Sequence, residues 1–130
     1  MKIVVGYRKD SVSDDVLKLA ASHAKVFNAK VYVVSSLKGG EGEKMDDIDK
    51  AESNLTYAVE YLKELGVDSE QKLLVRGMAP GEDIVQFSEE NDADEVIVGV
   101  VKISKVGKLL MGSTAQYVIL HSPCPVISVK

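Results

Sequence analysis

The sequence predicts an α/β protein, built as a three-layer α/β/α sandwich around a five-stranded parallel sheet. Short β-branched runs recur along the chain, and segments with helical spacing separate them. The runs are continuous rather than alternating, which is typical of parallel strands covered by helices on both faces. Strands and helices therefore alternate, with right-handed crossovers expected between them. The five predicted strands are Ile3–Val5, Val31–Val34, Leu73–Val75, Val96–Val98 and Val126–Val129.

The first helix is predicted from Ser13 to Phe27, between the first two strands. Its apolar residues recur at the spacing of one helical face, which we expect to be buried. A hydroxyl at Ser11 or Ser13 is expected to cap the helix by accepting from unpaired amides of the first turn. The predicted buried face comprises Val16, Leu17, Ala20, Ala21, Ala24 and Phe27.

The second helix has the clearest pattern, because its apolar residues follow one another at steps of 3 and 4. A coiled coil would show the same spacing, but about three heptads flanked by strands favour a helix that packs within a domain. Asp46, Asp47 and Asp49 suit its N-terminal end, where carboxylates meet the positive pole of the helix. Gly66 is expected to end it with a positive φ. The apolar face is Ile48, Ala51, Leu55, Ala58, Leu62 and Leu65.

The third helix is predicted to open at Pro80. Proline suits the first helical position because the N–H that it lacks would be unpaired there anyway. Ile84, Phe87 and Ser88 are expected to point inward.

The last helix is predicted to begin at Ser113 and to end near His121, before Pro123 and Pro125. Ser113 and Gln116 match the Ser-x-x-Gln capping box, in which two side chains satisfy two backbone donors.

Composition excludes several classes of function. The 130 residues suit one domain, 1–130, and 20 acidic against 16 basic residues give a net charge of −4. Electrostatic binding to nucleic acid or anionic lipid is therefore not expected. A membrane-spanning segment is not expected either, since no apolar run approaches about 18 residues. Cys124 is the single cysteine and there are two histidines, so neither a disulfide nor a metal site is expected. With no secretory segment, a cytoplasmic location is expected.

The segment after the fourth strand is the candidate binding site. Ligands of open parallel sheets lie outside the carboxyl ends of the strands, where the strand order reverses. Residues 100–111 hold three lysines and no acid. A helix N-terminus preceded by glycine forms an anion site, which favours a phosphorylated small molecule such as a nucleotide. The same glycine, serine and lysines would also suit a turn, a helix cap and a solvated basic surface, which is the alternative interpretation without a ligand. The candidate nucleotide-binding residues are Gly99, Lys102, Gly112, Ser113 and Thr114.

Rival functions lack their residues. Arg8 and Arg76 stand where a response-regulator receiver needs acids, and Tyr7–Asp10 stands where flavodoxin has a hydroxyl-rich phosphate loop. Neither the glycine fingerprint of dinucleotide-binding enzymes nor a P-loop occurs. His23 and His121 adjoin serines, but we interpret both as surface or helix-end residues. We therefore predict no catalytic residues and no enzyme.

Gly99 and Gly112-Ser113 carry a resemblance to a known family. They resemble the nucleotide motif of the universal stress proteins, which reads Gly, two residues, Gly, nine residues, Gly, then Ser or Thr. The similarity extends over essentially the whole chain, including the ending Pro123–Val126. It implies a flavodoxin-like fold with strand order 3-2-1-4-5. It also implies a homodimer paired along the last strand, where Pro125 suits an edge. The ligand implied is ATP or a related adenine nucleotide, with Mg²⁺, held without efficient turnover.

Two positions depart from the family pattern. Lys102 replaces the middle glycine, and Arg8 stands where ATP-binding members usually have Asp. A guanidinium cannot accept a hydrogen bond from ribose, which leaves Asp10 as a substitute acceptor. Two hypotheses follow: an ATP-binding stress or signalling module, and a dimeric interaction protein of the same family that does not bind ATP.

Overall fold

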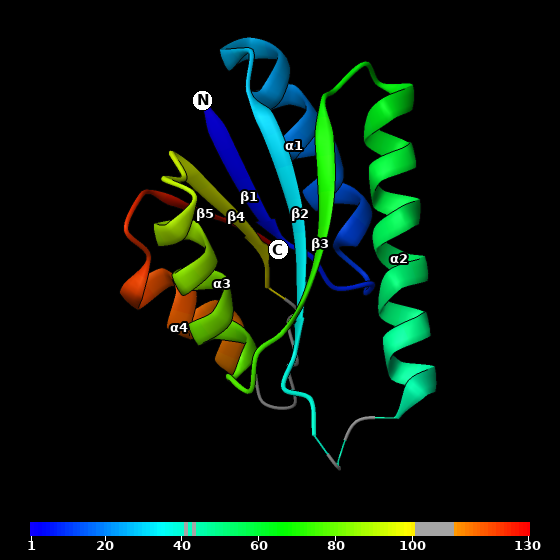
Figure 1. The fold of residues 1–130 in the computed structure, drawn as a ribbon. Helices are drawn as coiled ribbons and strands as arrows, with labels where there is room; N and C mark the ends of the chain where they lie inside the picture. Colours follow the sequence, from blue (N-terminus) through cyan, green and yellow to red (C-terminus); the bar gives the residue numbers. More distant parts are fainter. Residues whose placement is uncertain (41, 43, 101–110) are drawn as a thin grey trace, which may run out of the picture.

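The computed structural model describes residues 1–40, 42, 44–100 and 111–130. These residues form a five-stranded parallel sheet in the order β3-β2-β1-β4-β5, with helices on both faces (Figure 1). The predicted fold class and the strand order implied by the resemblance are both confirmed. The elements are β1 Lys2–Gly6, α1 Ser13–Phe27, β2 Lys30–Leu37, α2 Met45–Glu64, β3 Ser69–Val75, α3 Pro80–Glu90, β4 Glu95–Gly99, α4 Ser113–His121 and β5 Val126–Val129.

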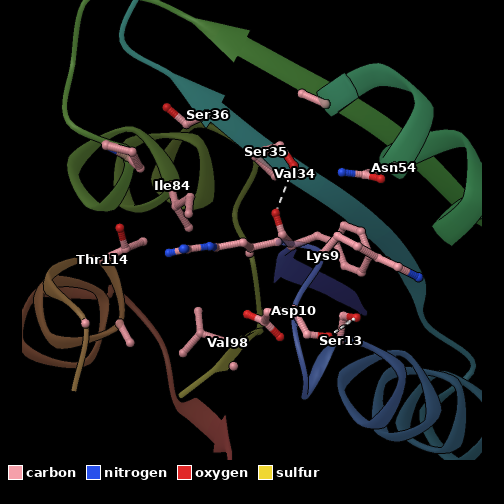
Figure 2. A pocket seen from close by; sticks show the side chains of 18 of the residues that line it. Lys9, Asp10, Ser13, Val34, Ser35, Ser36, Asn54, Ile84, Val98 and Thr114 are labelled. Atoms are coloured by element: carbon pink, nitrogen blue, oxygen red, sulfur yellow. Dashed lines mark hydrogen bonds between the residues drawn. The ribbon is translucent and has the colours of Figure 1, made fainter. Parts of the chain in front are cut away.

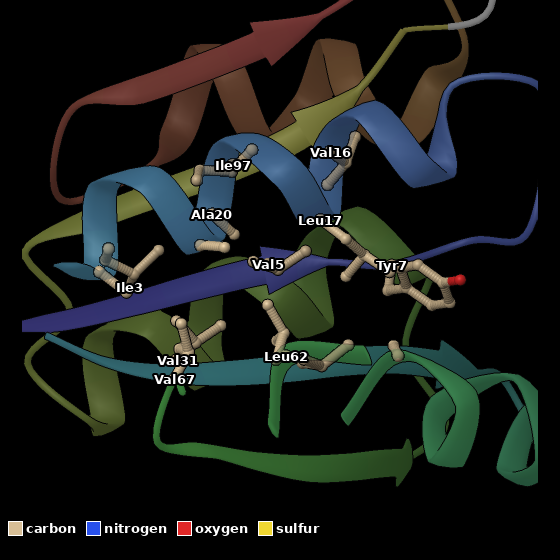
Figure 3. Close-up of a cluster of buried hydrophobic side chains, with 14 of the residues drawn as sticks. Ile3, Val5, Tyr7, Val16, Leu17, Ala20, Val31, Leu62, Val67 and Ile97 are labelled. Carbon is tan, nitrogen blue, oxygen red and sulfur yellow. The ribbon is translucent and has the colours of Figure 1, made fainter. Parts of the chain in front are cut away.

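Two apolar cores lie on opposite faces of the sheet. Helices α1 and α2 cover the first core (Figure 3), and α3 and α4 cover the second. Residues 3–5 of β1 are fully buried, as the continuous apolar run predicts. β3 and β5 are less buried than β1, because each lies at an edge of the sheet with a strand on one side only.

The helix boundaries follow the predictions closely, but two residues of the predicted buried faces are exposed. Phe27 is 50% exposed and Leu65 is 37% exposed. Phe27 is the last residue of α1 and Leu65 follows the last residue of α2, so both lie where the helices leave the sheet. Gly66 has φ +77° and ends α2 as predicted.

Neither predicted side-chain cap forms. The N-cap of α1 is Val12, and the Ser13 hydroxyl donates to the Asp10 carbonyl at 2.9 Å instead of accepting. The N-cap of α4 is Gly112, which puts Ser113 inside the helix, beyond the position of a capping box. The capping-box prediction was wrong because Gly112, in extended conformation, takes the N-cap position that the box requires Ser113 to occupy.

Helix α3 opens at Pro80 and buries Ile84, Phe87 and Ser88, as predicted. A Cβ atom on Gly81 would lie 2.9 Å from the Cβ of Tyr117, so glycine at this position allows α3 and α4 to pack closely. Within the described ranges, no helix combines the length and the apolar character needed to cross a lipid bilayer.

Candidate functional site

A cleft of about 880 Å³ opens at the carboxyl ends of β1, β2 and β4 (Figure 2). The N-terminal parts of the four helices α1 to α4 complete its walls. The chain leaves β1 for a helix on one face of the sheet and leaves β4 towards a helix on the other face. The cleft therefore lies at the switch point, where ligands of open α/β sheets bind.

The N-terminus of α4 forms one wall of the cleft. Its first helical hydrogen bond runs from the Gln116 amide to the Gly112 carbonyl at 3.1 Å, so the amides of residues 113–115 precede the helical ladder. A Cβ built on Gly112 would meet nothing within 4 Å. The helix end therefore presents amides and a partial positive charge beside open space, which suits an anion.

Four of the five candidate nucleotide-binding residues line this one cleft: Gly99, Gly112, Ser113 and Thr114. The fifth, Lys102, lies outside the described residues. Gly99 also has a packing reason to be glycine, since a Cβ there would lie 2.8 Å from Val12 Cγ2. It allows β4 to approach the start of α1, which positions the floor of the cleft.

The segment after β1 places charged side chains in the cleft. Arg8 is exposed and lines it, together with Lys9 and Asp10. Asp10 Oδ1 accepts a hydrogen bond from the Val12 amide at 2.9 Å, so one carboxylate oxygen serves the turn into α1. The Lys9 ammonium lies 3.9 Å from the centre of the Tyr57 ring, a cation–π distance that ties this segment to α2.

The end of β2 contributes functional candidates that sequence reasoning missed. Ser35 Oγ donates to the Tyr7 carbonyl at 2.8 Å (Figure 2), and Ser36 Oγ donates to Asp83 Oδ2 at 2.7 Å. Asp83 is fully buried in α3 and is also bound by Arg76. The available signal was the change from valine to serine inside a strand, since polar residues at the carboxyl end of a buried strand face the ligand edge.

Tyr7 lies between the core and the cleft. Tyr7 is buried, with only 5% of its surface exposed, and its hydroxyl has no hydrogen-bond partner among the described residues. Figure 3 shows the hydroxyl pointing away from the neighbouring core residues Val5 and Leu62. Burial raises the pKa of Tyr7 above its usual value of 10.0, so the phenol stays neutral at physiological pH.

The residues weighed for catalysis lie apart from the cleft. His23, which we predicted to be a surface or helix-end residue, is partly exposed on α1, and its Nδ1 donates to the buried Glu95 carboxylate at 2.8 Å. His121 is exposed at the end of α4, as predicted. Burial raises the pKa of the half-buried Cys124, which fits a packed thiol and not a reactive one. In the part of the chain that the structure describes, no group of three His, Cys, Asp or Glu side chains could hold a metal ion.

Fold and site together define a doubly wound α/β domain whose ligand cleft ends at a helix N-terminus. The sequence profile of the Universal stress protein family matches residues 1–130, and the chain belongs to that family.

Three relatives illustrate the membership. A curated universal stress protein of Methanocaldococcus jannaschii is 32% identical over 99% of this chain and 81% of its own length. The structure of a universal stress protein from Archaeoglobus fulgidus is 41% identical, with a TM-score of 0.91 over 100% of this chain and 93% of that one. A structure of the universal stress protein from Archaeoglobus fulgidus in complex with dAMP is 37% identical, with a TM-score of 0.85 over 99% of this chain and 96% of that one.

Proposed function

We propose that this protein binds an adenine nucleotide in the cleft and acts as a cytoplasmic, ligand-responsive stress or signalling module without efficient turnover. The observation that carries the proposal is the N-terminus of α4, which opens beside Gly112 into a cleft of about 880 Å³ at the switch point of the sheet. The dAMP complex of a relative that is 37% identical supports the class of ligand.

In this proposal the phosphates lie against the amides of residues 113–115, with the hydroxyls of Ser113 and Thr114 as further donors. The sugar and base then extend towards β2 and α2. ATP is the proposed nucleotide. Mg²⁺ would accompany its phosphates, and the carboxylate of Asp10, which lines the same cleft, is an oxygen ligand of the kind that it takes.

Thermal unfolding with and without nucleotide tests the proposal. A ligand at 100 times its dissociation constant adds about 2.7 kcal/mol to the free energy of unfolding. We expect ATP with Mg²⁺ to raise the midpoint temperature of the wild type. A parallel measurement with AMP alone tests whether the terminal phosphates contribute to binding. No shift with millimolar ATP or AMP, and no nucleotide released from denatured protein, would reject nucleotide binding.

The second hypothesis, a dimeric interaction protein without ATP, is favoured by one observation. Arg8 lines the cleft at the position where ATP-binding members usually have an acceptor. We propose a homodimer under either hypothesis, paired along β5, because β5 is an edge strand. Sedimentation equilibrium of the wild type tests the dimer. The Arg8→Asp variant tests whether Arg8 prevents nucleotide binding, since binding gained only by the variant would support the second hypothesis.

A further inference from the structure

Ser35 and Ser36, at the end of β2, both donate their hydroxyl protons to other groups of the protein. A serine hydroxyl has one proton and two acceptor lone pairs. Ser35 donates to the Tyr7 carbonyl at 2.8 Å, and Ser36 donates to the Asp83 carboxylate at 2.7 Å. A carbonyl and a carboxylate can only accept, so neither hydroxyl can be reversed without losing its bond. Ser35 and Ser36 both line the cleft, and each can offer it lone pairs only.

Arg76 and Asp83 fix this polarity at Ser36. Asp83 is fully buried, and its Oδ1 accepts from Nε and from Nη2 of Arg76, both at 2.6 Å. Arg76 is held in turn by Glu90, whose Oε1 lies 2.8 Å from Nη1. A guanidinium is always charged and a paired carboxylate has no proton to give. Asp83 therefore always accepts from Ser36, and we regard Asp83 and Arg76 as positioning residues for that hydroxyl.

We propose that Ser36, oriented by Asp83 and Arg76, selects ligands that present a hydrogen-bond donor to the β2 end of the cleft. This inference rests on the proposed nucleotide function. With the phosphates at α4, the base extends towards β2, where Val34 and Ile84, which belong to the core on the Ser36 side of the sheet, also line the cleft. The amino group of adenine would donate to Ser36. The carbonyl of a 6-oxopurine would set lone pairs against lone pairs and leave both atoms unpaired.

Isothermal titration calorimetry with ATP and with inosine triphosphate tests the proposal, because the two differ at the base edge that carries C6. We expect the wild type to bind ATP at least about tenfold more tightly, the ratio that one lost hydrogen bond supports. In Ser36→Ala the ratio should fall towards one, mainly through weaker ATP binding. Ser53→Ala is the matched control, since Ser53 is exposed on α2 and does not line the cleft.

The Asp83→Asn variant separates positioning from a general structural role. The asparagine carbonyl can accept from Arg76, while its amide donates to Ser36 and turns the serine proton towards the cleft. We therefore expect the preference to shift towards inosine triphosphate. General loosening of the site would instead weaken both nucleotides alike. If circular dichroism shows that Asp83→Asn does not fold, Ser36→Ala decides the question.

Two results would overturn the inference while nucleotide binding stands: equal affinity of the wild type for both triphosphates, or an unchanged preference in Ser36→Ala. If the wild type binds neither triphosphate, the inference and the proposed function both fail. A preference for ATP that Ser36→Ala removes and Ser53→Ala keeps would establish Ser36 as the determinant.

Discussion

Replacing Arg76 by methionine leaves a buried carboxylate without its cation. Asp83 has no exposed surface, whereas the Arg76 side chain is 30% exposed. Removing one partner of a buried ion pair costs about 3–5 kcal/mol. Because water reaches Arg76 and Ser36 keeps its bond to Asp83, we take a lower cost of about 2–3 kcal/mol. For a domain of this size, that corresponds to a midpoint lower by about 10 °C.

Urea unfolding followed by far-ultraviolet circular dichroism measures this cost. Arg8→Met is the control, because it makes the same chemical change at an exposed position and should alter stability by less than about 0.5 kcal/mol. The double variant Arg76→Met with Asp83→Leu should recover most of the loss, since it removes the unpaired charge. If Arg76→Met changes stability no more than Arg8→Met does, the pair does not hold Asp83 in place and the reasoning is refuted.

Three further predictions concern the cleft and its floor. Gly112→Val should abolish the thermal shift with ATP while the circular dichroism spectrum stays unchanged, because the side chain fills the open space beside α4; retained binding would contradict this. Gly99→Ala should cost about 1–3 kcal/mol in urea unfolding, since its Cβ would lie 2.8 Å from Val12 Cγ2; a neutral result would show that α1 can shift. Tyr7→Phe should cost nothing and can add about 1 kcal/mol, because the buried hydroxyl has no partner among the described residues. Burial raises the pKa of Tyr7 above 10.0, so as the pH rises the phenol of the unfolded state ionises before that of the folded state. The free energy of unfolding of the wild type should therefore fall above about pH 10, and it should fall less steeply in Tyr7→Phe. Parallel pH profiles of the two proteins would refute this prediction.

The sequence predicts those features that depend on the spacing of apolar residues and on the conformational limits of single residues. The boundaries of α1 and the opening of α3 at Pro80 follow from apolar spacing and from the missing proline N–H. The caps were predicted less well, because whether Ser13 donates or accepts depends on which carbonyl lies nearby. Phe27 was misplaced because helical spacing does not tell where the sheet under the helix ends.

The candidate site divides in the same way. That Gly99, Gly112, Ser113 and Thr114 line one cleft could be predicted, because they stand at or after the end of one strand in a recognisable order. The group of Ser36, Arg76 and Asp83 could not, since it brings the end of β2 together with a residue after β3 and a residue of α3, and Ser36 is distant from both along the chain. Its bonds span 47 and 7 residues, from Ser36 to Asp83 and from Arg76 to Asp83. No local pattern marks a contact that the fold alone creates.

The distribution of acceptors in the cleft shows where selectivity should reside. Arg8 cannot accept a hydrogen bond from a ribose hydroxyl, and one oxygen of Asp10 is already used by the Val12 amide. The hydroxyls of Ser35 and Ser36, by contrast, are acceptors whose direction is fixed by the bonds that they donate. A change at the base should therefore weaken binding more than a change at the sugar. We expect 2′-deoxy-ATP to bind within about threefold of ATP, less than one hydrogen bond is worth. Calorimetry that shows a larger loss for the deoxy sugar than for the oxo base would place the selective contact at the ribose instead, with the free oxygen of Asp10 as its acceptor.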